Sequence, residues 1–173
     1  MPRRLVQAEI DFLARYFGES LDTDTIRVAA TRGRRAYSIR GSHIRLPRPC
    51  FADRDTIAAV DLMNPWAAAT LAHEATHVWQ RQRGVWVTLK GAWLQLGDQC
   101  GRDPYAYNRE ESNPTRMFLQ FFHGNIERQG QIVEDLVFAD QTGQEAPQFS
   151  EIHAYLLSAA FRQAVPPTLA TES

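Results

Sequence analysis

The part of the chain that most constrains its fold is a short segment, His73-Glu74-Ala75-Thr76-His77. On an α-helix, residues four positions apart lie on the same face, so both imidazoles would point in one direction. Two neutral imidazoles in this arrangement can bind a zinc ion, and the glutamate beside them can accept a proton from water at the metal. A chance match in a chain of this length is on the order of one in a few hundred. The segment therefore predicts a helix that carries a metal site, and two unrelated surface histidines are the weaker alternative.

The residues around this segment mark both ends of the helix. Asn64-Pro65 is a good N-cap followed by proline in the first helical position, where the missing N–H costs nothing. Gly84 follows a basic last turn, which is typical of a helix C-terminus. A mostly apolar stripe recurs at helical spacing between these ends: Leu71, Ala75, Val78 and Gln82. His73 and His77 lie off this stripe, so we expect a rigid helix whose imidazoles face a cleft.

A catalytic zinc site needs a third protein ligand. A further histidine downstream is excluded, because Gln80 and Arg83 occupy the positions of the extended HExxHxxGxxH pattern. The segment 125–135 predicts a second helix that is capped by Asn125 and presents Glu127, Gln131 and Glu134 on one face. We favour Glu127 as the ligand and keep Glu134 as the alternative, while a solvated helix face is the third interpretation.

A glycine inside this second helix also carries information. Gly130 lowers helix propensity by roughly 1 kcal/mol relative to alanine. A glycine at such a position indicates that a neighbouring helix approaches closely. We therefore expect the second helix to pack against the helix of the two histidines, which would let a glutamate reach the same metal ion.

The two helices together resemble the gluzincin class of zinc metallopeptidases, in which a later helix supplies a glutamate to a HExxH helix. More narrowly, the chain is similar to small bacterial proteins described as Vgr-related or Rhs/Vgr-associated, which are linked to type VI secretion or related contractile injection systems. The resemblance covers most of the chain, and its specific matches lie in the two helices. The matching segments are 2–5, 8–10, 73–80, Tyr105 with Tyr107, and 125–133.

The resemblance implies a zinc ion held by His73, His77 and Glu127, with Glu74 as the general base of a hydrolysis reaction. The chain departs from the gluzincin pattern at one position. Gluzincins usually carry an acid four residues after the ligand glutamate, where it accepts a hydrogen bond from a ligating histidine, and this position is Gln131 here. An amide can also accept such a bond, but it raises the basicity of the ligand less than a carboxylate does.

The order of elements predicts an α+β fold, a minimal zincin-like domain with a small twisted N-terminal sheet packed on the two helices. A first helix is expected at 7–17, and three short strands at 26–30, 36–40 and 43–46. Residues 85–96 are ambiguous between strand and helix, and 97–114 reads as a loop over the cleft. A last helix is expected at 152–165, before a frayed tail at 166–173. In zincins the strand before the active helix pairs with an extended peptide, and that strand would be 43–46 here.

Composition limits the classes of partner. With 173 residues the chain fits a single domain, 1–173, and a net charge of −1 gives no electrostatic reason to expect nucleic acid. No apolar run approaches the roughly 20 residues of a membrane span, and no secretory signal is visible. Cys50 and Cys100 are too few for a disulfide framework, so free thiols are expected. We therefore expect synthesis in the cytoplasm, with delivery by a contractile injection system as a possible later step.

The function that fits these observations is a zinc-dependent hydrolase, most simply a peptidase acting on a peptide or protein. Tyr105 and Tyr107 are candidate catalytic residues, because a phenol over the cleft could donate to an oxyanion, although both could equally be packing residues. One alternative is a non-catalytic, zinc-stabilised adaptor of a secretion assembly, which closed four-ligand coordination would support. Another is an amidase that acts on peptidoglycan stem peptides.

Overall fold

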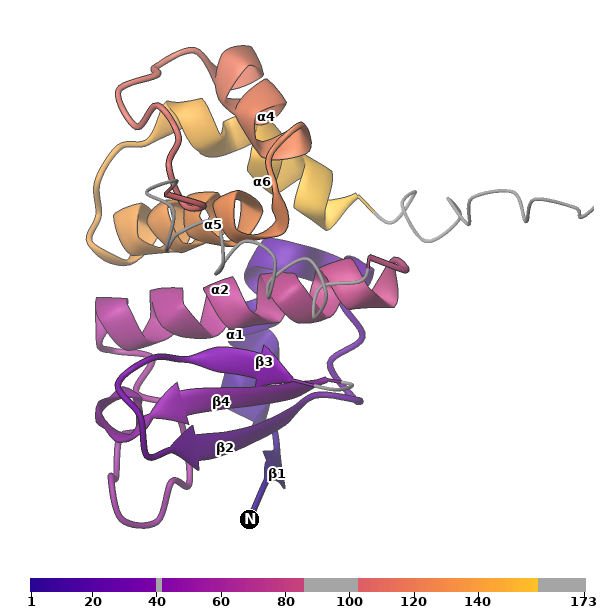
Figure 1. Ribbon diagram of the computed structural model, residues 1–173. Coiled ribbons are helices and arrows are strands. Elements are labelled where there is room, and N and C mark those ends of the chain that lie inside the picture. Colours follow the sequence, from indigo (N-terminus) through magenta and orange to yellow (C-terminus); the bar gives the residue numbers. More distant parts are fainter. Residues whose placement is uncertain (40–41, 86–102, 159–173) are drawn as a thin grey trace, which may run out of the picture.

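The computed structural model describes residues 1–39, 42–85 and 103–158. These residues form a four-stranded sheet and a set of helices, so the predicted α+β class is confirmed. The helices are α1 (Gln7–Phe17), α2 (Pro65–Gln82), α4 (Pro114–Phe122), α5 (Ile126–Gln141) and α6 (Ser150–Leu157). Figure 1 shows that α2 runs between the sheet on one side and α5 on the other, with α4 and α6 beyond α5.

The sheet has the strand order β1-β2-β4-β3, with β1 at Arg3–Arg4, β2 at Arg27–Thr31, β3 at Tyr37–Ile39 and β4 at His43–Pro47. β4 pairs in parallel with β2 and antiparallel with β3. The expectation that 43–46 would line a cleft and pair with a peptide is therefore wrong, because neighbouring strands occupy both edges of β4. The outer strand on that side is β3, which also contacts α2.

The helix α2 is buried along most of its length. Every residue from 67 to 80 is buried, because the sheet and α5 cover opposite sides of the helix. The run of small side chains at Ala67, Ala68 and Ala69 lets neighbouring elements approach closely. The predicted stripe was right for Leu71, Ala75 and Val78, but Gln82 is exposed and accepts a hydrogen bond from the Asp22 N–H at 2.9 Å.

The predicted ends of α2 are confirmed. The Asn64 side chain accepts hydrogen bonds from the backbone N–H groups of Trp66 and Ala67, and Pro65 is the first helical residue. Gly84 follows the helix with φ +77, a conformation that disfavours other residues. The histidine segment is thus fixed in the middle of a helix whose two ends are both closed by local hydrogen bonds.

The remaining elements agree with the sequence to different degrees. The helix α1 spans its predicted residues, and β2, β3 and β4 lie within a residue or two of the three predicted strands, whereas β1 is not predicted by the sequence argument. The last helix begins at Ser150, two residues before its predicted start, and Leu157 is its last helical residue, followed by an extended Ser158. The predicted end at 165 lies outside the described residues. The predicted segment 85–96 and the tail 166–173 fall almost entirely outside the described residues.

The helix α4 is not predicted by the sequence argument. Its N-terminus repeats the arrangement of α2, because Asn113 caps the helix and Pro114 occupies its first position. Met117 and Phe121 are buried, and the Phe121 ring packs edge-on against Tyr155 of α6. The cap followed by this apolar spacing was the signal that could have identified the helix. No helix within the described ranges is long and apolar enough to cross a membrane.

Candidate metal centre

Four side chains meet where α2 packs against α5. α2 contributes His73, Glu74 and His77, all buried, and α5 contributes Glu127 from its first turn. The Oε2 atom of Glu127 lies 3.7 Å from Nε2 of His73 and 3.4 Å from Nε2 of His77. One ligand-type atom from each of His73, His77 and Glu127 lies within 4.8 Å of the others. These three side chains are therefore close enough to share one metal ion.

The ring of His73 is oriented by an acid on α5. Its Nδ1 atom lies 2.8 Å from Oε2 of Glu134. Because a carboxylate only accepts hydrogen bonds, Nδ1 carries a proton, and in the neutral ring the lone pair of Nε2 faces Glu127. Glu134 therefore holds a ligand-type ring, and it is Glu127 that lies among the converging atoms.

Gln131, at the position where gluzincins usually carry the acid that orients a histidine, bonds within α5. Its amide donates to Oδ1 of Asp135 at 3.0 Å, one turn further along α5. The carboxylate partner of the histidine is supplied by Glu134, seven residues after Glu127. On a helix, positions i and i+7 share a face, whereas i+4 is rotated by about 40°, so the crossing of the two helices decides which residue reaches the ring.

A proton or a metal ion can bridge the converging atoms. Burial lowers the pKa of His73, but the nearby carboxylates of Glu127 and Glu134 outweigh this and raise the pKa to about 10. Burial likewise raises the pKa of Glu127, yet its contacts with His73 and His77 hold it well below the ordinary range. With both imidazoles neutral, their Nε2 lone pairs and the Glu127 carboxylate are all acceptors, and a cation between them would satisfy all three. The donor set of two imidazoles and one carboxylate fits zinc, which prefers such ligands.

Gly130 brings α5 into contact with the ring of His73. A Cβ atom at this position would lie 2.8 Å from Nε2 of His73 and 3.0 Å from its Cε1. No side chain larger than hydrogen fits there without a shift of the ring. The close approach expected from this glycine is confirmed, and it occurs at the metal-binding edge of the histidine.

Glu74 is buried next to this cluster without forming a complete set of hydrogen bonds. Its side chain is 4% exposed, and Oε2 has no hydrogen-bond partner among the residues described. Burial raises the pKa of Glu74, the neighbouring His77 and His73 lower it, and Glu127 raises it further. The hydroxyl of Ser38 on β3 faces this carboxylate and lowers its pKa. A buried oxygen without a donor costs folding free energy, so the unpartnered Oε2 points to a role outside stability.

The two candidate tyrosines occupy different surroundings. The Tyr105 ring lies 6.3 Å from the ring of His73, centroid to centroid, which brings it to the edge of the cluster. The Tyr107 hydroxyl donates to Asp135 on α5, and Arg109 stacks over its ring. The structure thus brings Tyr105 to the candidate site and ties Tyr107 to a neighbouring charged pair.

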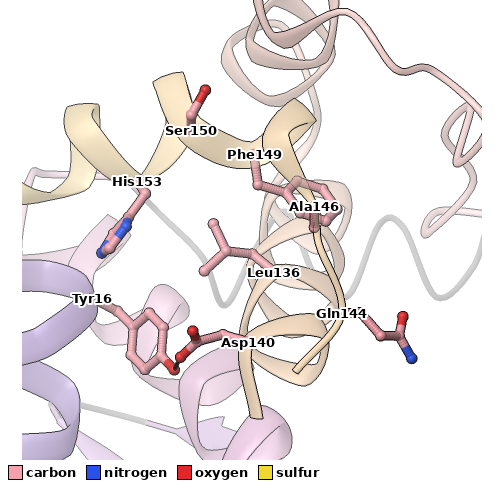
Figure 2. A pocket seen from close by; sticks show the side chains of 8 residues that line it. All are labelled: Tyr16, Leu136, Asp140, Gln144, Ala146, Phe149, Ser150 and His153. Carbon is pink, nitrogen blue, oxygen red and sulfur yellow. Dashed lines mark hydrogen bonds between the residues drawn. The ribbon is translucent and has the colours of Figure 1, made fainter. Parts of the chain in front are cut away.

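Another hollow lies away from this cluster, between α1, α5 and α6 (Figure 2). Within it the Tyr16 hydroxyl donates to Asp140 at 2.5 Å, and burial is the main reason that the pKa of Tyr16 is raised to about 12. His153 borders the same hollow and faces the Arg15 carbonyl oxygen at 3.0 Å. None of these residues belongs to the group around Glu127, so the hollow of Figure 2 is separate from the candidate metal centre.

Comparison with known proteins shows that the chain is similar to part of a bacterial secretion-system protein. It is 31% identical over 138 residues to the type VI secretion system spike protein VgrG2b of Pseudomonas aeruginosa. The match covers 77% of this chain but 13% of VgrG2b, so the chain corresponds to a small part of that protein. The effector domain of Pseudomonas aeruginosa VgrG2b has a solved structure that aligns with a TM-score of 0.64 at 29% identity, covering 88% of this chain and 82% of that one. No protein-family model matches the chain.

The chain is therefore homologous to the VgrG2b effector domain, and this homology links it to the Vgr-related proteins of type VI secretion. The expected resemblance to that group is confirmed at this level. The roles of individual residues, the metal and the reaction stay predictions.

Proposed function

We propose that this protein is a zinc-dependent hydrolase that cleaves peptide bonds and acts as an effector of a type VI or related contractile secretion system. One observation carries the proposal: the buried Glu74 carboxylate, with an unpartnered oxygen, lies beside two imidazoles and a carboxylate that converge on one point. A purely structural metal site has no use for an adjacent buried acid that keeps one oxygen without a hydrogen-bond donor. A hydrolytic site needs such an acid as a base.

The proposed roles follow from the contacts. His73, His77 and Glu127 would hold zinc, which when bound supplies Lewis acidity that polarises a carbonyl and makes water more acidic. Glu74 would accept the proton of the attacking water and pass it to the leaving amine. Its raised pKa suits this exchange, because a base whose pKa lies closer to neutrality both takes and returns a proton readily.

An extended peptide could reach Glu74 along β3. Among the strands of the described residues, β3 is the outer one on this side of the sheet, and its Ser38 faces the Glu74 carboxylate. A peptide added at this edge would bind through backbone hydrogen bonds, while pockets beside it would select side chains. This arrangement supports a peptide as the substrate class.

The hydrolase and the adaptor differ in the coordination of zinc, since closed coordination by four protein ligands would favour the adaptor. Three ligand residues converge in the part of the chain that the structure describes, and Glu134 supplies an acid that orients one of them, His73. Both features support the hydrolase. The stem-peptide alternative uses the same catalytic residues, and the choice of substrate in the experiment below separates it from general peptide cleavage.

Metal removal tests the proposal directly. The purified protein is stripped with a chelator, reloaded with zinc, and offered a mixed peptide library in parallel with peptidoglycan stem peptides. We expect cleavage products from the zinc-loaded protein and none from the stripped protein, since the water has no other activator. Products from stem peptides alone would make the protein an amidase of the cell wall. Absence of products from both, with about one zinc bound per chain, would contradict the hydrolase proposal and favour the adaptor.

Two glutamate variants serve as matched controls for this experiment. Glu127→Ala should lose zinc, because it removes one of three ligands. Glu134→Ala leaves all three ligands and should weaken zinc binding by only about 10–100-fold, the usual effect of losing an outer partner. The metal content of each variant, measured at the same free zinc concentration, shows which variant binds zinc more weakly. Zinc retention in Glu127→Ala with loss in Glu134→Ala would exchange the two roles.

The two tyrosines predict different kinetics. Tyr105→Phe removes a hydroxyl at the edge of the site and should lower kcat by about 10²–10³-fold if that hydroxyl donates to the developing oxyanion. Tyr107→Phe removes a hydroxyl that bonds to Asp135 and should leave kcat within a few-fold of wild type. Steady-state kinetics on one cleaved peptide compares them. An equal loss in both variants would show that neither phenol acts at the reacting carbonyl.

A further inference from the structure

We propose that Gln80 is the positioning residue that sets the coordinating form of His77 and ties this ring to the helix that carries Glu127. This inference rests on the metal site proposed above and adds a residue that no part of that proposal uses. Gln80 is buried, with 1% of its surface exposed, and lies one turn after His77 on α2.

The hydrogen bonds around Gln80 fix the orientation of its amide. Its Nε2 atom donates to the carbonyl oxygen of Ile126 at 3.1 Å and to Oε1 of Gln129 at 2.8 Å. A carbonyl oxygen only accepts, so the atom of Gln80 that faces Ile126 must be the nitrogen. The same reasoning applies to Gln129, whose Nε2 donates to the carbonyl oxygen of Phe121 at 3.1 Å. Two backbone carbonyls thus leave neither amide free to flip.

This orientation determines the tautomer of His77. The oxygen of Gln80 lies 2.9 Å from Nδ1 of His77. Because that oxygen can only accept, Nδ1 must carry the proton, and Nε2 is left with its lone pair directed toward Glu127. The form of the imidazole that can coordinate a metal through Nε2 is therefore selected by a neutral side chain on the same helix.

The same amide links the two helices of the site. Ile126 is the first residue of α5, directly before Glu127, so the bond from Gln80 holds the turn that presents the carboxylate. Gln129 extends the link to the last turn of α4 through Phe121. One buried side chain thus bonds to His77 on α2 and to the backbone next to Glu127 on α5.

The two imidazoles are consequently held by different chemistry. His73 has a carboxylate partner, Glu134, whereas His77 has an amide partner, Gln80. A carboxylate raises the basicity of a ligand more than an amide does. Zinc would then be held by one imidazole with a charged hydrogen-bond partner and one with a neutral partner. The neutral partner limits the negative charge that is buried around Glu74.

The tautomer can be measured without any variant. In zinc-loaded wild-type protein with ¹⁵N-labelled histidine, the ring of His77 should show a proton on Nδ1 and none on Nε2. A proton on Nε2, with zinc at Nδ1, would overturn the proposal. If wild-type protein binds no zinc, the proposed metal site fails first, and that result is seen before any variant is made.

Three variants then test the role of the amide through zinc affinity, measured by competition with a fluorescent chelator. Gln80→Leu removes the acceptor and should weaken zinc binding by about 10–100-fold. Gln80→Glu keeps an oxygen facing Nδ1 but turns its other oxygen toward the Ile126 carbonyl oxygen, so it should keep the proton on Nδ1 of His77 while it loses the link between the helices. Gln129→Leu removes a neighbouring, half-buried amide but leaves the bond to Ile126, so its affinity should stay near wild type.

The alternatives are equally distinct. Wild-type zinc affinity in Gln80→Leu, or loss of the proton from Nδ1 of His77 in Gln80→Glu, would show that the acceptor does not position His77. An equal loss of affinity in Gln129→Leu would show that any partly buried amide in this region has the same effect. Each of these results contradicts the inference while leaving the metal site itself intact.

Discussion

Replacing Glu74 by glutamine is expected to lower kcat/KM for peptide hydrolysis by about 10²–10⁴-fold, the contribution of a well-placed general base. Glutamine has nearly the same shape as glutamate but cannot take a proton from water. The three residues that would hold zinc are unchanged, so the variant should still bind about one zinc ion per chain. Kinetics and metal analysis on the same preparation check both parts of the result.

The stability of Glu74→Gln provides the control. In the wild-type protein, burial raises the pKa of this carboxyl, which means that the folded state disfavours its charge. Removing the charge should therefore leave the unfolding midpoint unchanged or higher, and the activity would be lost without loss of fold. Loss of zinc in the variant would identify Glu74 as a ligand. Full activity would remove the base from the mechanism.

The second large effect is expected from Gly130→Ala. The added methyl group would overlap Nε2 of His73 at 2.8 Å, so the ring must move away from the point where the three ligand atoms meet. The ring is buried and bonded to Glu134, and it cannot move without breaking that bond or displacing α5. We expect zinc affinity to fall by at least about a hundredfold, the upper end of the effect of disturbing an outer partner.

Stability should change much less in this variant than metal binding does. In a helix, alanine is more stable than glycine by about 1 kcal/mol, and this gain offsets part of the cost of moving the ring. Gly84→Ala is the matched control, since its φ of +77 strains alanine by about 1–2 kcal/mol although no atom lies near the new methyl group. That variant should lose stability and keep its zinc affinity. Chelator competition measures the zinc affinity of both variants, and thermal unfolding measures their stability. A normal zinc affinity in Gly130→Ala would contradict the close contact between Gly130 and the His73 ring.

The sequence was most informative where local chemistry decides the structure. The N-cap at Asn64, the proline after it and the glycine at position 84 fixed the bounds of α2 before any packing was known. Gly130 indicated a close helix contact, because a glycine inside a helix is unfavourable unless a neighbour requires it. From these features the meeting of His73, His77 and Glu127 could be expected.

The sequence was less informative where the answer depends on how elements cross. Whether Gln131 or Glu134 reaches His73 is decided by the rotation of α5 against α2, and residue spacing alone allows both. The position of β4 between β2 and β3 follows from sheet order, which strand patterns do not reveal. Gln80 was considered only as the position that lacked the glycine of a longer motif, because nothing in the sequence shows that its amide faces a histidine.

The stripe on α5 made by Glu127, Gly130 and Glu134 has a use beyond this molecule. All three residues contact the ring of His73 on α2. Glu127 faces its Nε2 atom, Gly130 leaves space for the ring, and Glu134 bonds to its Nδ1 atom. Written as letters, the two helices read HExxHxxQ followed by ExxGxxxE. A search that demands both patterns in order would separate chains able to build this centre from the many that carry HExxH by chance, and a one-residue insertion within the second pattern would disqualify a candidate.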